Sequence, residues 1–396
     1  MPDWHLAQGY RFSGVHCGIR PELDRRDLAL LVSDRPATAA GVFTQNRIVA
    51  APVRICRERL PASNVRGIVI CSGNANACTG QRGLEDARRM TALAAMLLEC
   101  ESEQMLVCST GVIGRPLPMP SIEDGIRKAA KDLQSSAIAF DQAAHAILTT
   151  DTHIKVSTRL IQTSDGPARI TGLAKGAAMI GPNMATLLAF VLTDAPIAVE
   201  DLTKLARSAA DQSFNCVRVE GHTSTNDSLI FLANGAGTPW QGEPLAAFES
   251  AAKEVCRDLA MSIAGDAEGA THLVTIQVEG TRDDDEARRI GRAVADSPLV
   301  KTAIYGADPN WGRVVSAAGY AGVDFQEEQL SLWLGDLPVY QAGAPLPFDA
   351  ASASAYIKNN RAISMLLRLT LGSGQATVWT CDLTPEYVHL NADYTT

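Results

Sequence analysis

The chain has 396 residues, of which 46% are hydrophobic and 20% charged, the composition of an ordinary globular protein and not of a disordered one. That length is enough for two or three domains whose cores do not depend on metals or disulfides. The net charge of -9, without any cluster of Lys and Arg, argues against a nucleic-acid-binding surface, because binding to phosphate requires a basic face.

The cysteine and histidine content points to a reducing compartment without a metal site. The nine cysteines are an odd number and include no Cys-x-x-Cys pair, so buried thiols are expected in place of disulfides or zinc. The seven histidines are dispersed, which predicts no metal. The first residues lack a secretory signal, and no apolar segment approaches the ~20 residues that span a bilayer. We therefore expect a soluble, cytoplasmic protein with no membrane partner.

The first 150 residues alternate apolar strands with amphipathic helices. A polar turn is predicted at Ser33–Pro36, and a helix is predicted to begin at Ser121, where Asp124 gives the spacing of a capping box. The expected elements are strands at 28–32, 39–43, 67–71 and 105–108, and helices at 85–100, from 121, and at 137–148.

Three of these elements end in small polar residues. The segment Ser72–Gly80 is either a loop that presents its amides to a ligand or a well hydrogen-bonded turn. The strand at 105–108 stops in Thr110 and Gly111, where unpaired amides could hold an oxyanion, although turns of this kind are common. The segment Thr149–Thr152 could bind a small polar ligand or simply satisfy a helix end.

The stretch Lys175–Leu192 combines a loop rich in Gly, Ala and Pro with an apolar run that predicts a buried strand from Leu187. Thr186 lies at the junction. A hydroxyl on a rigid strand, faced by small side chains, is accessible to other groups, as a nucleophile must be. Thr186 could equally open the strand and do nothing more, since Thr is a good strand former.

The second half continues the alternation of helices and strands. Glu268, next to a glycine at a loop-strand junction, could receive a substrate ammonium, although such a carboxylate is more often solvated. His222 reads as a surface residue, because no catalytic partner is near it in sequence. An α/β fold with mixed sheets is expected, because hairpin-like strand pairs occur near 270 and 330. Helices are predicted at 199–209, 248–263 and 350–359, and strands at 229–233 and 273–278.

Common cofactor and nucleophile motifs are absent from the sequence. Gly372-Ser373-Gly374 lacks the third glycine of a dinucleotide fingerprint, and there is neither a P-loop nor a Gly-x-Ser-x-Gly elbow. Cys78 and Cys108 each follow an apolar strand without an adjacent base, so both are expected to be buried, inert thiols.

Taken together, a series of segments resembles the ornithine acetyltransferase family, enzymes of arginine biosynthesis that move an acetyl group from N-acetylornithine to glutamate. The segments occur in the family's order and cover nearly the whole chain. They are Pro36–Thr44, Ser72–Gly80, Ser109–Gly114, Thr149–Thr152, Lys175–Gly176 with Pro182–Thr186, Ser224–Asp227, Glu268–Thr271, Asp308–Arg313 and Asn391–Thr396.

The resemblance implies that the chain cleaves itself between Ala185 and Thr186. The product is then an N-terminal fragment of residues 1–185 and a C-terminal fragment of residues 186–396, two copies of each remaining associated. The fold implied is a layered α-β-β-α-type sandwich with mixed sheets. The Thr186 hydroxyl attacks the Ala185 carbonyl, and water hydrolyses the resulting ester. The freed α-amino group, with an unperturbed pKa of ~7.7 to 8.0, can then serve as the base.

The resemblance also assigns the site. Thr186 is the implied nucleophile of a ping-pong acetyl transfer, and Thr110 and Gly111 are the implied oxyanion hole. No cofactor is implied, but acetyl-CoA as a second donor is left open, so the enzyme could be bifunctional. The substrate-binding positions carried over are Thr149, Lys175, Thr186, Glu268, Asn391 and Thr396.

The chain departs from the family pattern at a few positions near these segments. Glu220-Gly221-His222 stands where Asp-Gly-Asp is usual, Ile154 where Pro is common, and Ala177-Ala178 where a Ser or Gly pair is more usual. These departures bear on substrate choice and on the speed of self-cleavage.

Two other classes of protein are considered. A self-cleaving N-terminal-nucleophile aminopeptidase of related fold would carry Ser at position 186 and lack Lys175, and an unprocessed binding protein would remain one uncut chain.

Overall fold

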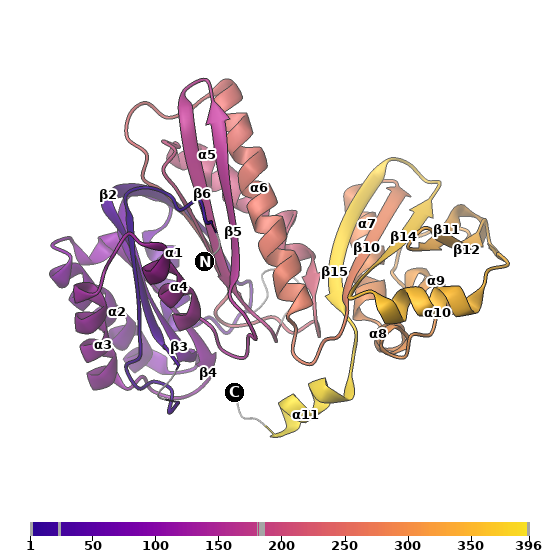
Figure 1. Cartoon of the computed structure of the whole chain (residues 1–396), viewed down its shortest axis with the longest axis horizontal. Helices are drawn as coiled ribbons and strands as arrows, with labels where there is room; N and C mark the ends of the chain where they lie inside the picture. The colour runs from indigo at the N-terminus through magenta and orange to yellow at the C-terminus, as the bar shows by residue number, and fades with distance from the viewer. Residues whose placement is uncertain (1–2, 23–24, 180, 182–186, 394–396) are drawn as a thin grey trace.

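The computed structural model describes residues 3–22, 25–179, 181 and 187–393. The chain forms two lobes, each built on one β-sheet (Figure 1). The first sheet has the order β4-β3-β2-β9-β7-β6-β5, with β1 paired to β2. Its strands are β1 (Tyr10–Val15), β2 (Leu28–Phe43), β3 (Ala62–Asn74), β4 (Met105–Val112), β5 (Lys155–Thr163), β6 (Gly166–Lys175), β7 (Leu188–Thr193) and β9 (Ser228–Ala233).

The second sheet has the order β13-β12-β11-β14-β10-β15-β8. Both sheets contain parallel and antiparallel pairs, so the expected α/β fold with mixed sheets is confirmed. The strands of the second sheet are β8 (Val217–Arg218), β10 (Leu273–Thr281), β11 (Leu330–Leu334), β12 (Leu337–Gln341), β13 (Ala344–Pro345), β14 (Ala362–Leu369) and β15 (Gly374–Cys381).

Helices cover both sheets, and short 3-10 turns connect several elements. No helix within the described ranges combines the length and the apolar character needed to cross a membrane. The helices are α1 (Ala51–Arg59), α2 (Gly80–Leu97), α3 (Met119–Lys131), α4 (Ala137–Ala146), α5 (Val199–Asp211), α6 (Gly242–Gly265), α7 (Asp284–Asp296), α8 (Pro298–Tyr305), α9 (Trp311–Gly319), α10 (Ala350–Asn359) and α11 (Pro385–Asp393), and the 3-10 turns are Ser102–Gln104, Phe214–Cys216 and Glu327–Gln329.

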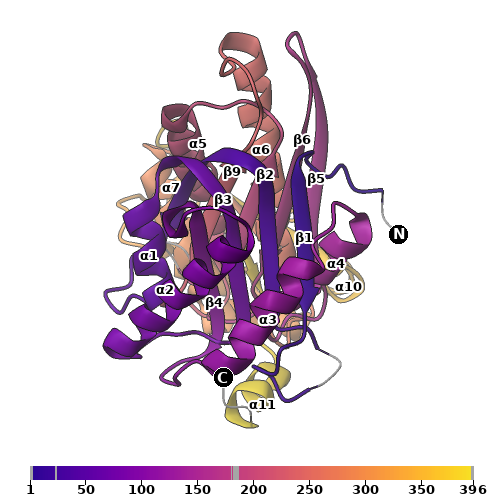
Figure 2. The same cartoon turned by 90° about the vertical axis from the view of Figure 1, so that its left-hand side faces the viewer.

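Alternation along β2 explains how the first lobe is layered. Leu28 and Leu30 pack with α2 and α3, which lie over that face in Figure 2. Leu31, on the opposite face, packs instead against Phe190 of β7 and Ile230 of β9. The outer faces of β7 and β9 are in turn covered by α5 and α6. The first lobe thus has one core on the Leu31 face of β2, to which α4 contributes, and others beneath α2 and α3 and beneath α5 and α6.

The strands that follow position 186 lie in the middle of the first sheet. β7 pairs antiparallel with β6, with Leu188 opposite Lys175, and parallel with β9. β9 in turn pairs antiparallel with β2. Two strands from the second half of the chain are therefore hydrogen-bonded between strands of the first half.

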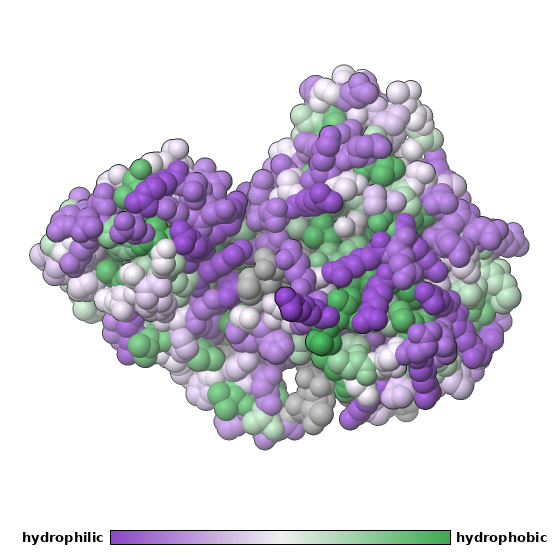
Figure 3. All heavy atoms as spheres, turned by 180° about the vertical axis from the view of Figure 1, so that it is seen from behind, coloured by the Kyte–Doolittle hydropathy of each residue, from purple (hydrophilic) through white to green (hydrophobic). Residues whose placement is uncertain are grey.

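The second lobe has its own core between β10, β11 and β14 and the helices α7, α8, α9 and α10. The long helix α6 packs on β5 and β6 and also contacts β10 and β15, so it links the lobes (Figure 1). The view from behind shows mostly hydrophilic side chains and a notch between the lobes (Figure 3).

Most predicted elements are present, but three local predictions are wrong. No turn occurs at Ser33–Pro36, because β2 runs through it. Its pairing with β3 continues beyond the segment with a shifted register, while its other edge pairs first with β1 and then with β9. Ser121 does not begin a helix: α3 starts at Met119, since Pro120 fits the first turn. The strand near 270 forms no local hairpin, because β10 pairs with β14 and β15, whereas the hairpin of β11 and β12 near 330 is confirmed.

The close packing of α6 on β6 gives a test of the fold. A Cβ at buried Gly172 would lie 2.3 Å from Val255 Cγ1 and 2.9 Å from Leu259 Cδ1 on α6. We expect Gly172→Ala to lower the free energy of unfolding by about 1 to 3 kcal/mol, as overpacking does. The control is Gly319→Ala, where no atom lies within 4 Å, so a change within about 0.5 kcal/mol is expected. Equal denaturant midpoints for both variants would contradict this packing.

Candidate active site

An open cavity of about 760 Å³ lies where distant segments of the chain meet at the end of β6. Its walls come from the ends of β4 and β6, the loop before β5, the loop after α6, and α11, which lies beneath the first sheet (Figures 1 and 2). The structure thus brings together every predicted site residue that it describes. The cavity is lined by Thr110, Gly111, Ile113, Thr149, Thr150, Lys175, Ala178, Met179, Glu220, His222, Glu268, Tyr387 and Asn391.

Thr110 and Gly111 lie where the regular pairing of β4 with β3 breaks down. Gly111 has a φ of 127°, and a Cβ there would lie 2.4 Å from the carbonyl carbon of Gly73. Only glycine fits this conformation and this close approach. An irregular strand end of this kind can leave backbone amides unpaired by the sheet, as an oxyanion hole requires.

Lys175 ends β6 with a side chain that is only 2% exposed. Its Nζ donates to Thr149 Oγ1 at 2.6 Å and to Thr110 Oγ1 at 3.4 Å. Burial lowers the pKa of Lys175, while the carboxylate of Asp151, 3.7 Å from the ammonium, opposes that shift. The lysine therefore joins the Thr110–Gly111 turn to the loop that carries Thr149.

A second buried lysine connects two sides of the cavity. Lys155 Nζ donates to Asp151 Oδ1 at 2.7 Å and to Asp266 Oδ2 at 2.6 Å, and we call this set of three residues the Lys155 bridge. Asp151 also accepts from the amides of Gly176 at 2.6 Å and Thr149 at 3.0 Å. Burial opposes ionisation of Asp151, but the charges of Lys175 and Lys155 outweigh it and hold the pKa of Asp151 well below its usual range.

Glu268 lies two residues after Asp266 of the Lys155 bridge and lines the cavity with its carboxylate. Its backbone amide donates to the carbonyl of Ala177 at 2.9 Å, which holds the loop after α6 against the segment after β6. Asn391 on α11 donates through Nδ2 to Glu268 Oε2 at 3.0 Å. The cavity therefore contains both an ammonium and a carboxylate, the complement of an amino-acid ligand.

The predicted cleavage-site residues Ala185 and Thr186, and the predicted substrate-binding Thr396, lie outside the described residues. The flanking strands nevertheless constrain where the chain runs. It leaves the first sheet after Lys175 and re-enters opposite the same residue, at Leu188. Both ends of the connecting segment are thus at the cavity.

Asp227 is a site residue whose role its sequence context does not predict. Its side chain is fully buried at the start of β9, and Oδ1 accepts from the Leu187 amide at 3.2 Å. Oδ2 has no hydrogen-bond partner within the described part of the chain. Burial raises the pKa of Asp227 well above its usual range, more than the Leu187 amide and nearby hydroxyls of Ser224 and Thr44 lower it. The only sequence signal was a run of polar residues before an apolar strand.

The remaining candidates divide into those at the cavity and those elsewhere. His222 is exposed, as expected, but it also lines the cavity with Glu220. Cys108 is buried as expected, and its hydrogen bond with Cys56 and its burial raise its pKa. The prediction for Cys78 is wrong, because this residue is exposed in a loop where its φ is 58°. Among the described residues no three His, Cys, Asp or Glu are grouped for a metal.

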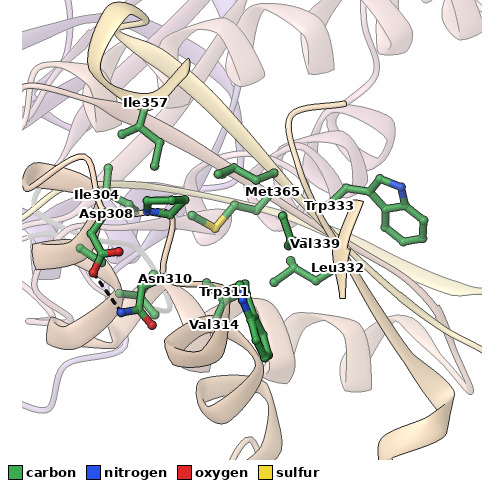
Figure 4. A pocket seen from close by; sticks show the side chains of 14 residues that line it. Ile304, Asp308, Asn310, Trp311, Val314, Leu332, Trp333, Val339, Ile357 and Met365 are labelled. Carbon is green, nitrogen blue, oxygen red and sulfur yellow. Dashed lines mark hydrogen bonds between the residues drawn. The ribbon is translucent and has the colours of Figure 1, made fainter. Parts of the chain in front are cut away.

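A different cavity, of about 370 Å³, lies in the second lobe (Figure 4). Its walls are largely apolar, with Trp311 and Met365 among them, and Asn310 is hydrogen-bonded to Asp308 at 2.9 Å. Trp311 stacks on Tyr340, and Arg313 donates to the Leu299 carbonyl. The segment Asp308–Arg313 therefore helps to build this lobe and lies outside the cavity that holds Lys175.

The chain is similar to known proteins over nearly its whole length. Residues 11–396 match the model of the ArgJ family. The arginine biosynthesis bifunctional protein ArgJ of Rhodopirellula baltica is 43% identical over 396 residues, which span 99% of this chain and 96% of that protein. The protein of the same name from Geobacter sulfurreducens is 45% identical over 394 residues, which span 98% of this chain and all (100%) of that protein.

Two solved structures are also similar. The crystal structure of arginine biosynthesis bifunctional protein ArgJ from Bacillus halodurans is 37% identical with a TM-score of 0.51, and the match covers 52% of this chain and 98% of that chain. Ornithine acetyltransferase from Mycobacterium tuberculosis, complexed with ornithine, is 35% identical with a TM-score of 0.43, over 46% of this chain and 95% of that chain. The family match over nearly the whole length, together with these relatives, shows that the chain belongs to the ArgJ family.

Proposed function

We propose that this chain is a bifunctional acetyltransferase of arginine biosynthesis that works through Thr186. It moves acetyl from N2-acetylornithine to glutamate, and it also forms N-acetylglutamate from acetyl-CoA. Its relatives carry the corresponding name. The observation that carries the proposal is the single cavity in which Lys175, Glu268 and the Thr110–Gly111 turn meet.

The first step is self-cleavage between Ala185 and Thr186. The Thr186 oxygen attacks the Ala185 carbonyl carbon, the peptide C–N bond breaks, and the acyl group moves to oxygen. Water then hydrolyses the ester and leaves residues 1–185 and 186–396 as two fragments with a free Thr186 amine. Leu188, the second residue after Thr186 in the sequence, pairs with Lys175.

The first sheet explains why the fragments would remain together. β7 and β9 belong to the C-terminal fragment, yet they pair with β6 and β2 of the N-terminal fragment. The Lys155 bridge crosses the same boundary, because Asp151 and Lys155 precede the cut and Asp266 follows it. The layered α-β-β-α arrangement is thus expected to survive the cut. A pair of each fragment is the expected assembly, and the nine free cysteines fit the cytoplasm.

The transfer cycle has two halves. The Thr186 oxygen attacks the acetyl carbonyl of N2-acetylornithine, the C–N bond breaks, and ornithine leaves with the proton that the Thr186 amine had taken from the hydroxyl. The amine of glutamate then attacks the acetyl-Thr186 ester and releases the Thr186 oxygen. With acetyl-CoA the bond that breaks is C–S, and the CoA thiol leaves. Thr110 and Gly111 bind the oxyanion in each step.

Substrate recognition follows from the charges of the cavity. Glu268, held by Asn391, can bind a substrate ammonium. Lys175 donates a hydrogen bond to the Thr149 hydroxyl, which brings the two side chains together. This pair can bind a carboxylate. Thr396 is assigned to the same ligand by resemblance alone. Metal and cofactor are not required by any of these steps.

The mass of the purified protein tests the mechanism. We expect two species, the second beginning at Thr186, and N-acetylglutamate as the main product. Thr186→Ala should leave one uncut chain without transfer, because both steps need the same hydroxyl, while Thr186→Ser should retain both. An intact chain with full transfer activity would contradict the role of Thr186, and release of acetate without transfer would favour the aminopeptidase-like alternative.

The Lys155 bridge gives a second test, made on the cleaved protein. Lys155→Met removes the buried cation from Asp266 and one of the two ammonium groups near Asp151, so we expect the free energy of unfolding to fall by about 3 to 5 kcal/mol. The matched control is Arg159→Met, which removes a half-exposed ion pair with Asp258 across the same boundary and should cost about 1 kcal/mol or less. Chemical denaturation measures both, and equal losses would mean that burial of the bridge contributes nothing.

The buried carboxyl of Asp227 predicts a pH dependence. In the unfolded chain this group ionises near pH ~3.9, whereas in the folded protein burial raises its pKa, so the folded state releases this proton only at higher pH. Wild-type stability should therefore fall relative to Asp227→Asn as pH rises. The melting temperature of the variant minus that of the wild type should grow as the pH rises above ~3.9, the pKa of the unfolded chain. A constant or shrinking difference would show that Asp227 is ionised in the folded state.

A further inference from the structure

A cavity of about 420 Å³ outside the candidate active site combines two guanidinium groups with an apolar wall. It lies between the segment that leads into α1 and the start of α2. None of its residues lines the cavity that holds Lys175. The lining residues are Arg47, Ile48, Val49, Ala51, Arg54, Cys78, Thr79, Gly80 and Leu84.

The two arginines of this cavity have no carboxylate counter-ion among the described residues, unlike the arginines of the adjoining helix α2. Arg47 and Arg54 are exposed, and neither has a carboxylate within 4.0 Å among the residues described. The arginines on the adjoining helix α2 are all paired: Arg82 with Asp86, Arg88 with Glu58 and Arg89 with Glu123. In a chain with a net charge of -9, two adjacent unpaired guanidinium groups mark a place for an anionic ligand.

The rest of the wall narrows the chemistry of that anion. Ile48, which is 55% exposed, lies beside Val49 and Leu84 in the same cavity. Apolar side chains next to arginine can hold a flat base while the guanidinium groups hold phosphate oxygens. The start of α2 adds its positive end, but the argument rests on the two arginines and the apolar wall. A nucleoside phosphate fits this combination better than an inorganic anion does.

The cavity is joined to the candidate active site by one short stretch of backbone. The Gly114 amide donates to the Ala77 carbonyl at 2.9 Å, and the Ala75 amide donates to the Val112 carbonyl at 2.9 Å. The loop whose residues Cys78–Gly80 line this cavity is therefore attached directly to the turn of Thr110 and Gly111. An extended ligand can place an acyl group at that turn and its phosphates at the arginines.

We propose that Arg47 and Arg54 bind the phosphates of the nucleotide end of acetyl-CoA, with the adenine against Ile48 and Leu84. This inference rests on the proposed second activity, in which an acetyl thioester is the donor. N-acetylornithine has no nucleotide, so its transfer does not use this cavity. The two activities of one protein therefore serve as each other's control.

The first experiment compares both activities in the double variant Arg47→Gln/Arg54→Gln. Two charge-assisted contacts are lost, so the KM for acetyl-CoA should rise about tenfold or more. Transfer from N-acetylornithine to glutamate should stay within about twofold of wild type. The matched control is Arg207→Gln, an exposed arginine of α5, which should change neither activity. An unchanged KM for acetyl-CoA, or an equal loss of both activities, would overturn the proposal.

The second experiment leaves the arginines in the protein and removes the nucleotide from the substrate. S-acetylpantetheine should have a higher KM than acetyl-CoA with the wild type, and nearly the same KM with wild type and double variant. If the double variant weakens S-acetylpantetheine as much as acetyl-CoA, the arginines do not contact the nucleotide.

Calorimetry with adenosine 3′,5′-bisphosphate measures the affinity of this cavity for a nucleotide without any turnover. We expect binding to wild type and to Arg207→Gln, and a loss of about tenfold or more in affinity with the double variant. Inorganic phosphate at the same concentration should compete poorly, and equal competition would reduce the cavity to a general anion site and overturn the proposal. If the wild type fails to use acetyl-CoA, the proposed second activity is wrong, and the bisphosphate measurement still decides whether the cavity binds a nucleotide.

Discussion

The architecture of the candidate active site depends on one buried ammonium placed between two buried carboxylates. Lys155 touches Asp151 on one side and Asp266 on the other, and all three side chains are almost completely removed from water. Such a group is stable only when every charge has its partners, because the desolvation of each ion is expensive. The chain meets this requirement with backbone amides of Thr149 and Gly176 on Asp151 and of Thr152 on Asp266. The same bonds set the positions of the loops that bear Thr149, Lys175 and Glu268.

Around this bridge the structure keeps charged groups in separate environments. Lys175 and Glu268 face the same cavity, one as a partly desolvated ammonium and the other as a carboxylate held by an amide. Asp151 is strongly ionised by the lysines beside it, whereas Asp227, with no cation in contact, has a pKa raised by burial. The pKa values of two buried carboxyls are thus shifted in opposite directions. That contrast is typical of sites in which a proton and a negative charge must each be kept in a defined place.

The fold class and most element positions could be predicted from local patterns. Continuous apolar runs identified β4, β7 and β9, and helical spacing identified α5 and α6. The change of partners along β2 could not be predicted, because polar residues at Asp34–Pro36 look like a turn when the pairing strands are unknown. Cys78 likewise followed an apolar strand but lies in an exposed loop.

Some residues of the candidate site could also be predicted from the sequence, and others could not. Thr110, Gly111, Thr149, Lys175, Glu268 and Asn391 were named from resemblance, and they meet in one cavity although they come from segments spread over most of the chain. Lys155 was not named, because a lysine at the start of a strand normally reads as solvated. Its partner Asp266 is 111 residues away in sequence. Asp227 was quoted only within a motif, since its isolation is a property of its three-dimensional surroundings.

The central place of β7 and β9 has a consequence for the order of events during maturation. These two strands pair with each other, and the outer edge of each is hydrogen-bonded to a strand from the opposite side of residue 186, β7 to β6 and β9 to β2. The first sheet must therefore be assembled while the polypeptide is still continuous, and scission is a finishing step on an already folded scaffold. Two separately made halves would each begin with exposed strand edges and would be prone to pair wrongly before finding one another.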